Sequence, residues 1–113
     1  MDFTELRKHP RVSVELFADW GWGPDCENYD KITSLSLTGC FLATKRDLNR
    51  GDEIYLRLSS ESFGVINLRG AVRYQLRVME GARPTGVGVE FIGISNESQA
   101  KLQQVMNSSG EIA

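Results

Sequence analysis

The chain has 113 residues, of which 41% are hydrophobic and 25% charged, and this composition predicts one globular domain with one core. Its formal net charge of −2 disfavours a general nucleic-acid binder but leaves room for a locally basic anion site. No apolar run approaches the roughly 20 residues that span a bilayer, and the acidic N-terminus does not resemble a secretory signal. We therefore expect a cytoplasmic protein with no membrane span.

Alternating hydrophobicity predicts three strands in the first half of the chain. Apolar residues occupy the even positions from Val12 to Trp20, and this period of two is typical of a half-buried strand. A loop rich in glycine and polar residues follows. It leads to a second strand near residues 31–35 and a short third strand at residues 40–44.

Two further strands are predicted after the turn at Gly51. The first covers residues 54–59, where the apolar residues again alternate with polar ones. The second is long, and Gly70 inside it indicates a bend or a bulge. Its even positions are predicted to face inward and carry Ile66, Leu68, Val72, Tyr74 and Leu76.

A sixth strand and one helix complete the predicted fold. Residues 86–91 alternate, with the apolar side chains of this strand facing inward. Ser95 or Asn96 is suited to cap a helix over residues 95–107, whose apolar stripe is formed by Leu102, Val105 and Met106. Six strands joined by short connections favour a closed or nearly closed barrel, with the helix over one mouth.

Two segments have the residue types of an anion or nucleotide site. Residues 1–11 have no core-facing pattern and are expected to form a mobile arm, which carries Arg7, Lys8 and Arg11. Guanidinium groups bind phosphate oxygens bidentately and also match the O6/N7 edge of guanine. The second segment, residues 34–39, combines small hydroxyl side chains with a glycine in a predicted turn. Each segment alone also fits an ordinary solvated patch or turn.

Together the two segments resemble the PilZ domain, the bacterial receptor for cyclic di-GMP. The family signature is Arg-x-x-x-Arg before the first strand, which is complete at Arg7 and Arg11. It continues with Asp/Asn-x-Ser-x-x-Gly, where Ser36 and Gly39 match and Ser34 replaces the acidic or amide residue. The resemblance implies a mainly β fold in one domain over residues 1–113: a six-stranded antiparallel barrel at residues 12–93 with one C-terminal α-helix.

The resemblance also implies how the ligand is held. Arg7 and Arg11 would contact guanine and phosphate, Ser36 would hydrogen-bond the ligand, and Gly39 would let the backbone approach it closely. Three arginines line the outward face of the long strand, Arg69, Arg73 and Arg77, and a solvated face is the favoured interpretation. If one of them stacks on or neutralises the ligand, Arg73 is the best candidate. The full set of expected ligand-binding residues is Arg7, Lys8, Arg11, Ser34, Ser36, Gly39 and Arg73.

The family's ligand can also bind as a stacked dimer. In the family, an arginine immediately before the first motif is associated with that dimer, and this chain has Leu6 there. Leucine offers no planar cation to a second guanine, so we expect one cyclic di-GMP per chain.

We therefore predict a receptor that binds cyclic di-GMP and relays the signal to an unidentified protein effector. The alternative is a PilZ-like adaptor in motility or pilus function that binds no nucleotide. Ser34 favours this alternative, and the intact arginine pair opposes it. An enzyme is not expected, because His9 stands beside a proline with no acidic partner and no serine has an evident base.

The two cysteines are not expected to carry chemistry. One disulfide would be unusual in a reducing compartment, and two thiols with one imidazole lack the spacing of a zinc site. We predict a loop thiol at Cys26, a small buried residue at Cys40, and no bound metal.

Overall fold

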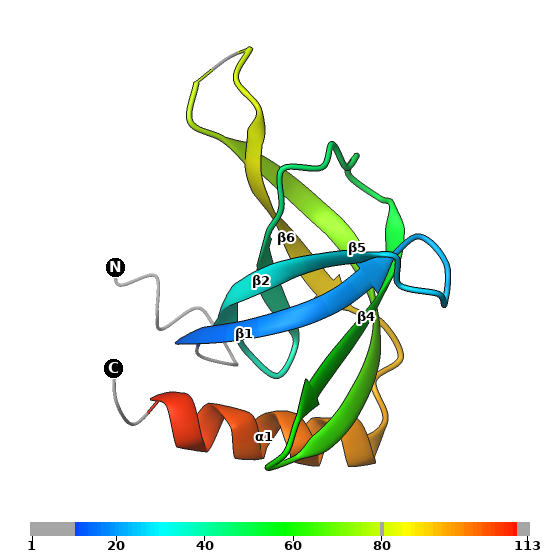
Figure 1. Cartoon of the computed structure of the whole chain (residues 1–113), viewed down its shortest axis with the longest axis vertical. Helices are drawn as coiled ribbons and strands as arrows, with labels where there is room; N and C mark the ends of the chain where they lie inside the picture. Colours follow the sequence, from blue (N-terminus) through cyan, green and yellow to red (C-terminus); the bar gives the residue numbers. More distant parts are fainter. Residues whose placement is uncertain (1–10, 80, 111–113) are drawn as a thin grey trace.

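The computed structural model describes residues 11–79 and 81–110, which form a closed antiparallel barrel followed by one helix (Figure 1). Around the barrel the strands follow the order β1-β2-β3-β6-β5-β4, so each strand has a hydrogen-bonded neighbour on both sides. The predicted fold class is confirmed. The elements are β1 (Val12–Gly21), β2 (Asn28–Leu35), β3 (Gly39–Ala43), β4 (Glu53–Ser60), β5 (Gly64–Arg77), β6 (Pro84–Phe91) and α1 (Asn96–Gly110).

The barrel interior is filled by the alternating apolar residues of its strands. In β4, for example, Ile54, Leu56 and Leu58 are buried while the residues between them are partly exposed. Trp20 is the largest fully buried side chain, and its indole Nε1 donates a hydrogen bond to Asp30 Oδ2 at 2.8 Å. Every strand contributes to this core, which includes Trp20, Ile32, Leu42, Leu56, Val72 and Val89.

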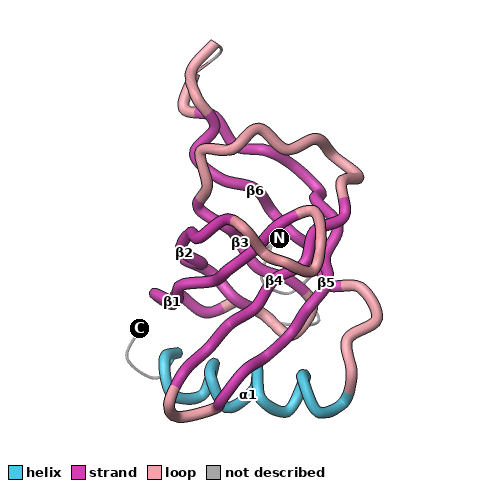
Figure 2. The backbone as a smooth tube through the Cα atoms, turned by 45° about the vertical axis from the view of Figure 1, so that its right-hand side comes forward, coloured by secondary structure: helices cyan, strands magenta, loops and turns pink. Residues whose placement is uncertain are grey.

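The helix α1 lies across one end of the barrel (Figure 2) and buries its apolar stripe there. The Ser95 Oγ caps it by accepting a hydrogen bond from the Ser98 amide at 3.1 Å. The helix continues past its predicted end at residue 107, because polar side chains near that end hydrogen-bond within the helix. The Ser108 hydroxyl donates to the Gln104 carbonyl at 3.0 Å. In the described part of the chain, no helix combines the length and apolarity needed to cross a membrane.

The prediction that Tyr74 and Leu76 face inward was wrong. These side chains are 45% and 50% exposed. The pairing of β5 with β6 shifts register between Val72 and Tyr74, and one extra residue moves the following side chains to the other face.

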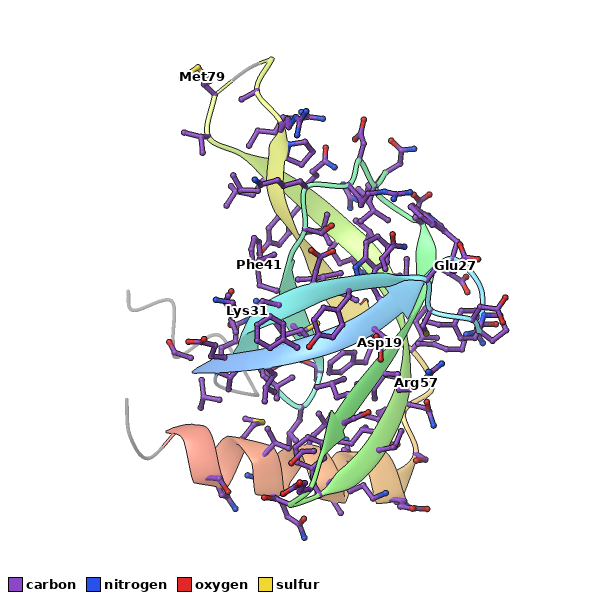
Figure 3. All side chains as sticks on the ribbon, viewed as in Figure 1. Asp19, Glu27, Lys31, Phe41, Arg57 and Met79 are labelled. Atoms are coloured by element: carbon purple, nitrogen blue, oxygen red, sulfur yellow. The ribbon has the colours of Figure 1, made fainter. Side chains whose placement is uncertain are left out.

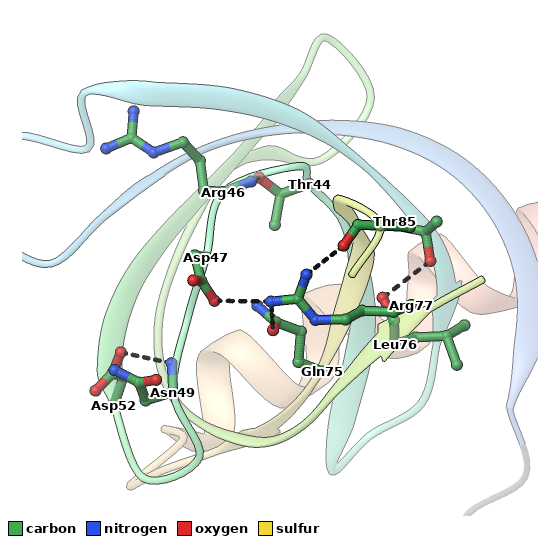
Figure 4. Close-up of polar contacts among 10 residues, drawn as sticks. Thr44, Arg46, Asp47, Asn49, Asp52, Gln75, Leu76, Arg77 and Thr85 are labelled. Atoms are coloured by element: carbon green, nitrogen blue, oxygen red, sulfur yellow. Dashed lines mark hydrogen bonds and ion pairs between the residues drawn. The ribbon is translucent and has the colours of Figure 1, made fainter. Parts of the chain in front are cut away.

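Beyond this bulge the β5–β6 hairpin projects from the barrel, with Met79 at its tip (Figure 3). The hairpin is tied to the loop between β3 and β4. Arg77 Nη2 lies 3.4 Å from Asp47 Oδ1 and donates to Gln75 Oε1 at 2.9 Å (Figure 4). The Arg77–Asp47 pair links the hairpin to this loop, whereas Gln75 lies on β5 itself.

Both cysteine predictions are confirmed, since the two thiols are free, Cys26 is half-buried and Cys40 is buried. Burial raises the pKa of the Cys40 thiol from 9.0 to about 12, and the charge of Arg11 opposes part of the rise. The thiol pKa is therefore higher in the folded than in the unfolded protein. The resulting contribution to stability is complete below about pH 9 and is lost as the pH rises toward 12.

We therefore expect alkaline conditions to destabilise the unchanged protein more than they destabilise a Cys40→Ala variant. Between about pH 9 and the folded-state pKa, the difference in unfolding free energy should change by about 1.4 kcal/mol per pH unit. Urea unfolding of both proteins from about pH 8 to about pH 11 measures this, and parallel pH profiles would contradict it.

Candidate functional site

A shallow pocket of about 160 Å³ lies on the barrel surface where β3, β5 and β6 adjoin the start of β1. It brings together three residues that the sequence predicted for the site, although they are far apart along the chain: Arg11, Gly39 and Arg73. We call it the outer pocket. Its described lining residues are Arg11, Thr38, Gly39, Arg73, Tyr74, Gly88, Val89 and Glu90.

The charged groups of the outer pocket come from three strands or their ends. Arg11 is exposed immediately before β1. Arg73 of β5 forms an ion pair with Glu90 of β6, and both side chains are about half exposed. Among the described residues, two guanidinium groups thus face one carboxylate, so the pocket is locally positive in a chain whose net charge is −2.

An aromatic wall borders these charges. The Tyr74 ring lies over the backbone of Gly88, where a Cβ atom would come within 2.1 Å of the ring. Phe41 of β3 (Figure 3) covers Gly86 in the same way, and the Phe41 and Tyr74 rings are 6.3 Å apart. The outer face of β6 has no side chain at these two glycines, which gives the neighbouring rings room to lie against the backbone there. A flat ring beside two guanidinium groups is a surface suited to a nucleobase.

The turn between β2 and β3 is shaped by the Ser36 side chain. Its buried Oγ accepts hydrogen bonds from the amides of Thr38 and Gly39, at 3.2 and 3.1 Å. The Ser36 amide donates to the Gly39 carbonyl at 2.9 Å, which closes the turn. This hydroxyl therefore fixes the backbone beside the outer pocket and does not line the pocket itself.

Of the other predicted site residues, Ser34 lies elsewhere. Ser34 is half-buried on β2, in register with Ser13 of β1 and Phe41 of β3, and does not line the outer pocket. Arg7 and Lys8 lie outside the described residues.

Sequence reasoning missed five of the described pocket residues, namely Thr38, Tyr74, Gly88, Val89 and Glu90. Glu90 carried a usable signal, because it alternates with buried Val89 and Phe91 and must face outward. The sequence gives no cross-strand register, however, and it is the register that places Glu90 opposite Gly39.

Gly39 has a packing role that the sequence did not reveal. A Cβ atom at this position would lie 2.3 Å from the carbonyl oxygen of Val89 on β6. The Thr38 carbonyl next to it accepts a hydrogen bond from the Phe91 amide at 2.8 Å. The glycine therefore lets the turn press against β6, which brings the turn to the edge of the outer pocket.

Two larger cavities have less suitable chemistry. One of about 550 Å³ lies between α1 and the barrel, and none of its described lining residues is charged. The other, of about 390 Å³, lies near the start of α1 and has one described guanidinium, Arg69, which is paired with Glu53 at 2.6 Å. The outer pocket has a second guanidinium, Arg11, beside its own paired arginine. For an anionic ligand the smaller outer pocket is the better candidate.

Comparison with known proteins identifies the fold and the family. The model of the PilZ domain matches residues 5–108. The chain belongs to the PilZ domain family. No curated protein matches it by sequence.

Solved PilZ structures share the barrel. The PilZ domain of YcgR from Escherichia coli, solved with c-di-GMP, has a TM-score of 0.68 at 18% identity, with 94% of this chain and 92% of that chain covered. MrkH of K. pneumonia, solved as a c-di-GMP complex, has a TM-score of 0.67 at 19% identity, covering 90% of this chain and 50% of that chain.

MotI/DgrA, an inhibitor of motility from Bacillus subtilis, has a TM-score of 0.70 at 18% identity, with the same coverages of 90% and 50%. This PilZ chain spans about half the length of the longer YcgR, MrkH and MotI chains. At these identities the likeness shows a common fold.

Proposed function

We propose that this PilZ domain is a receptor for cyclic di-GMP that binds the ligand at the outer pocket and passes the signal to a protein partner. One observation carries the proposal: Arg11 and Arg73 converge beside the Gly39 turn. The c-di-GMP complexes of YcgR and MrkH, which share the fold, support it. The domain acts in this view as a regulatory receptor and not as an enzyme.

The pocket chemistry fits a ligand with two guanines and two phosphates. Guanidinium groups at Arg11 and Arg73 offer forked donors to phosphate oxygens or to the O6/N7 edge of guanine. The Tyr74 ring offers a face on which a base can stack. Thr38 adds a hydroxyl at the rim of the pocket. The two guanidinium groups and the Tyr74 ring thus each have a chemical counterpart in the ligand.

The pocket is too small to enclose the whole ligand. Sites that bury drug-sized ligands usually measure about 300–1,000 Å³, whereas this one measures about 160 Å³. We propose that it holds one part of cyclic di-GMP and that Arg7 and Lys8, just before Arg11 in the chain, contact the rest. Ligand binding would then set the path of the segment before β1, and a protein partner would read that path.

The titration that tests this proposal also gives the stoichiometry. Calorimetry with cyclic di-GMP should show saturable binding of one ligand per chain, because Leu6 supplies no cation for a second guanine. GMP and cyclic AMP should bind more weakly. A ratio near two would contradict the single-ligand prediction. No heat at about 100 μM protein, where about 5.5 kcal/mol of binding free energy is detectable, would contradict the receptor.

A second candidate is a PilZ adaptor that binds no nucleotide. Two observations favour it: Ser34 does not line the outer pocket, and the Ser36 hydroxyl is used within its own turn. MotI/DgrA, described as an inhibitor of motility, shows that a related fold occurs in a motility protein. An adaptor would bind its protein partner with equal affinity in the presence and absence of cyclic di-GMP.

A further inference from the structure

Glu90 is the one acidic side chain that lines the outer pocket in the described part of the chain. It stands on β6, in register with Gly39 of β3 on one side and Ala71 of β5 on the other. Its side chain is 49% exposed and forms an ion pair with Arg73. A neighbouring cation thus holds the carboxylate in place while part of it still faces solvent.

A carboxylate facing a guanine site has a specific chemical use. Guanine presents two adjacent donors, N1–H and the N2 amino group, which match the two oxygens of a carboxylate. Adenine presents an acceptor at N1, which a carboxylate repels. Hypoxanthine keeps the N1 donor but lacks the amino group. A correctly placed carboxylate therefore distinguishes guanine from both other bases.

The residue that would supply this acceptor by resemblance to the family is Ser34, and its position is unsuitable here. A serine hydroxyl gives one oxygen and no charge. Strand β3 also lies between Ser34 on β2 and Glu90 on β6. At ordinary strand spacing, these two intervals separate β2 from β6 by roughly 10 Å. The outer pocket contains a carboxylate from a different strand.

We propose that Glu90 is the residue that reads guanine in this site, with Arg73 as the positioning residue that orients its carboxylate. The inference rests on the proposed function. Glu90 accepts the hydrogen bonds of the N1 and N2 groups of one guanine, and the Arg11 guanidinium is left to bind phosphate. In this chain the acceptor function belongs to β6 and not to β2.

The competing explanation is purely electrostatic, and it predicts the opposite result. If Glu90 only neutralised Arg73 and repelled the ligand phosphates, its removal would release a cation and tighten binding. If Glu90 reads guanine, its removal weakens binding even though the pocket becomes more positive. The sign of the effect therefore separates the two roles.

The experiment titrates three proteins, the unchanged domain, Glu90→Gln and Glu53→Gln, with cyclic di-GMP and with its inosine analogue cyclic di-IMP. Glu90→Gln should weaken cyclic di-GMP binding roughly 5- to 150-fold, the range of one good bidentate base contact. Its preference for cyclic di-GMP over cyclic di-IMP should fall toward one. Glu53→Gln is the matched control, because it breaks the similar Arg69–Glu53 pair away from the outer pocket and should keep both affinities within about twofold.

Each outcome decides a different point. If the unchanged domain does not bind cyclic di-GMP, the proposed function and this inference both fail. If it binds and Glu90→Gln binds as well or more tightly, or keeps the full preference over cyclic di-IMP, only the role of Glu90 is overturned. Melting temperatures of the variants confirm that the barrel is folded in each titration.

Discussion

Replacing Arg11 with alanine should weaken cyclic di-GMP binding roughly 5- to 150-fold while leaving the barrel folded. The guanidinium lines the outer pocket and would form bidentate contacts that alanine cannot replace. The side chain is exposed and precedes the first strand residue, Val12, so its loss removes little packing. Calorimetry measures the affinity, and the melting temperature reports the fold.

Arg50→Ala is the matched control for this experiment. Arg50 is also an exposed arginine, but it lies in the turn before β4 and away from the outer pocket. Its replacement makes the same change in net charge and should leave the affinity within about twofold. Equal loss in both variants would indicate a general charge effect, and no loss in Arg11→Ala would place the ligand elsewhere.

Gly39→Ala should lower the free energy of unfolding by about 1–3 kcal/mol, the usual cost of overpacking. The added Cβ would lie 2.3 Å from the Val89 carbonyl oxygen, so β3 and β6 would have to separate at the point where they pair. Because the turn borders the outer pocket, we expect ligand affinity to fall as well. Urea unfolding measures the loss of stability, and the m-value should be the same for the variant and the unchanged protein.

Gly23→Ala provides the comparison, because a Cβ atom at Gly23 meets nothing within 4 Å. This variant should unfold at the same urea concentration as the unchanged protein or slightly above it, because alanine restricts the unfolded chain. If Gly39→Ala also shows an unchanged midpoint, the glycine is not required for strand packing, and its place in the family motif must have another cause.

The strands of the barrel were predictable because their signal is local. Inward side chains alternate along β1 and β4, and a period of two is visible in any short window of sequence. The helix was predictable for the same reason, from the spacing of Leu102, Val105 and Met106. Neither inference needs to know which strands are neighbours.

The outer pocket was only partly predictable because it depends on neighbours. Arg73 could be placed on an outward face from its own strand, but its ion pair with Glu90 depends on how β5 pairs with β6. Tyr74 was placed inside because the alternation of β5 was extended through the bulge after Val72. A bulge is set by cross-strand pairing and the path of the hairpin, which a single strand does not encode.

The Ser36 hydroxyl shows a different limit. The sequence motif predicts a contact with ligand, whereas the structure shows the buried hydroxyl bonded to the amides of its own turn. The same residue type suits both uses, since Ser and Thr side chains often bond to nearby backbone groups. Residue identity alone does not distinguish a side chain that contacts the ligand from a side chain that only shapes the turn beside it.

The most direct test of the central claim is to map backbone amide chemical shifts while cyclic di-GMP is added. The ligand should perturb the amides around Gly39, Arg73 and Glu90, together with Arg11, and leave the groove between α1 and the barrel unchanged. Perturbations confined to Leu16, Val105 and their neighbours in that groove, or none at saturating ligand, would contradict a cyclic di-GMP site at the outer pocket.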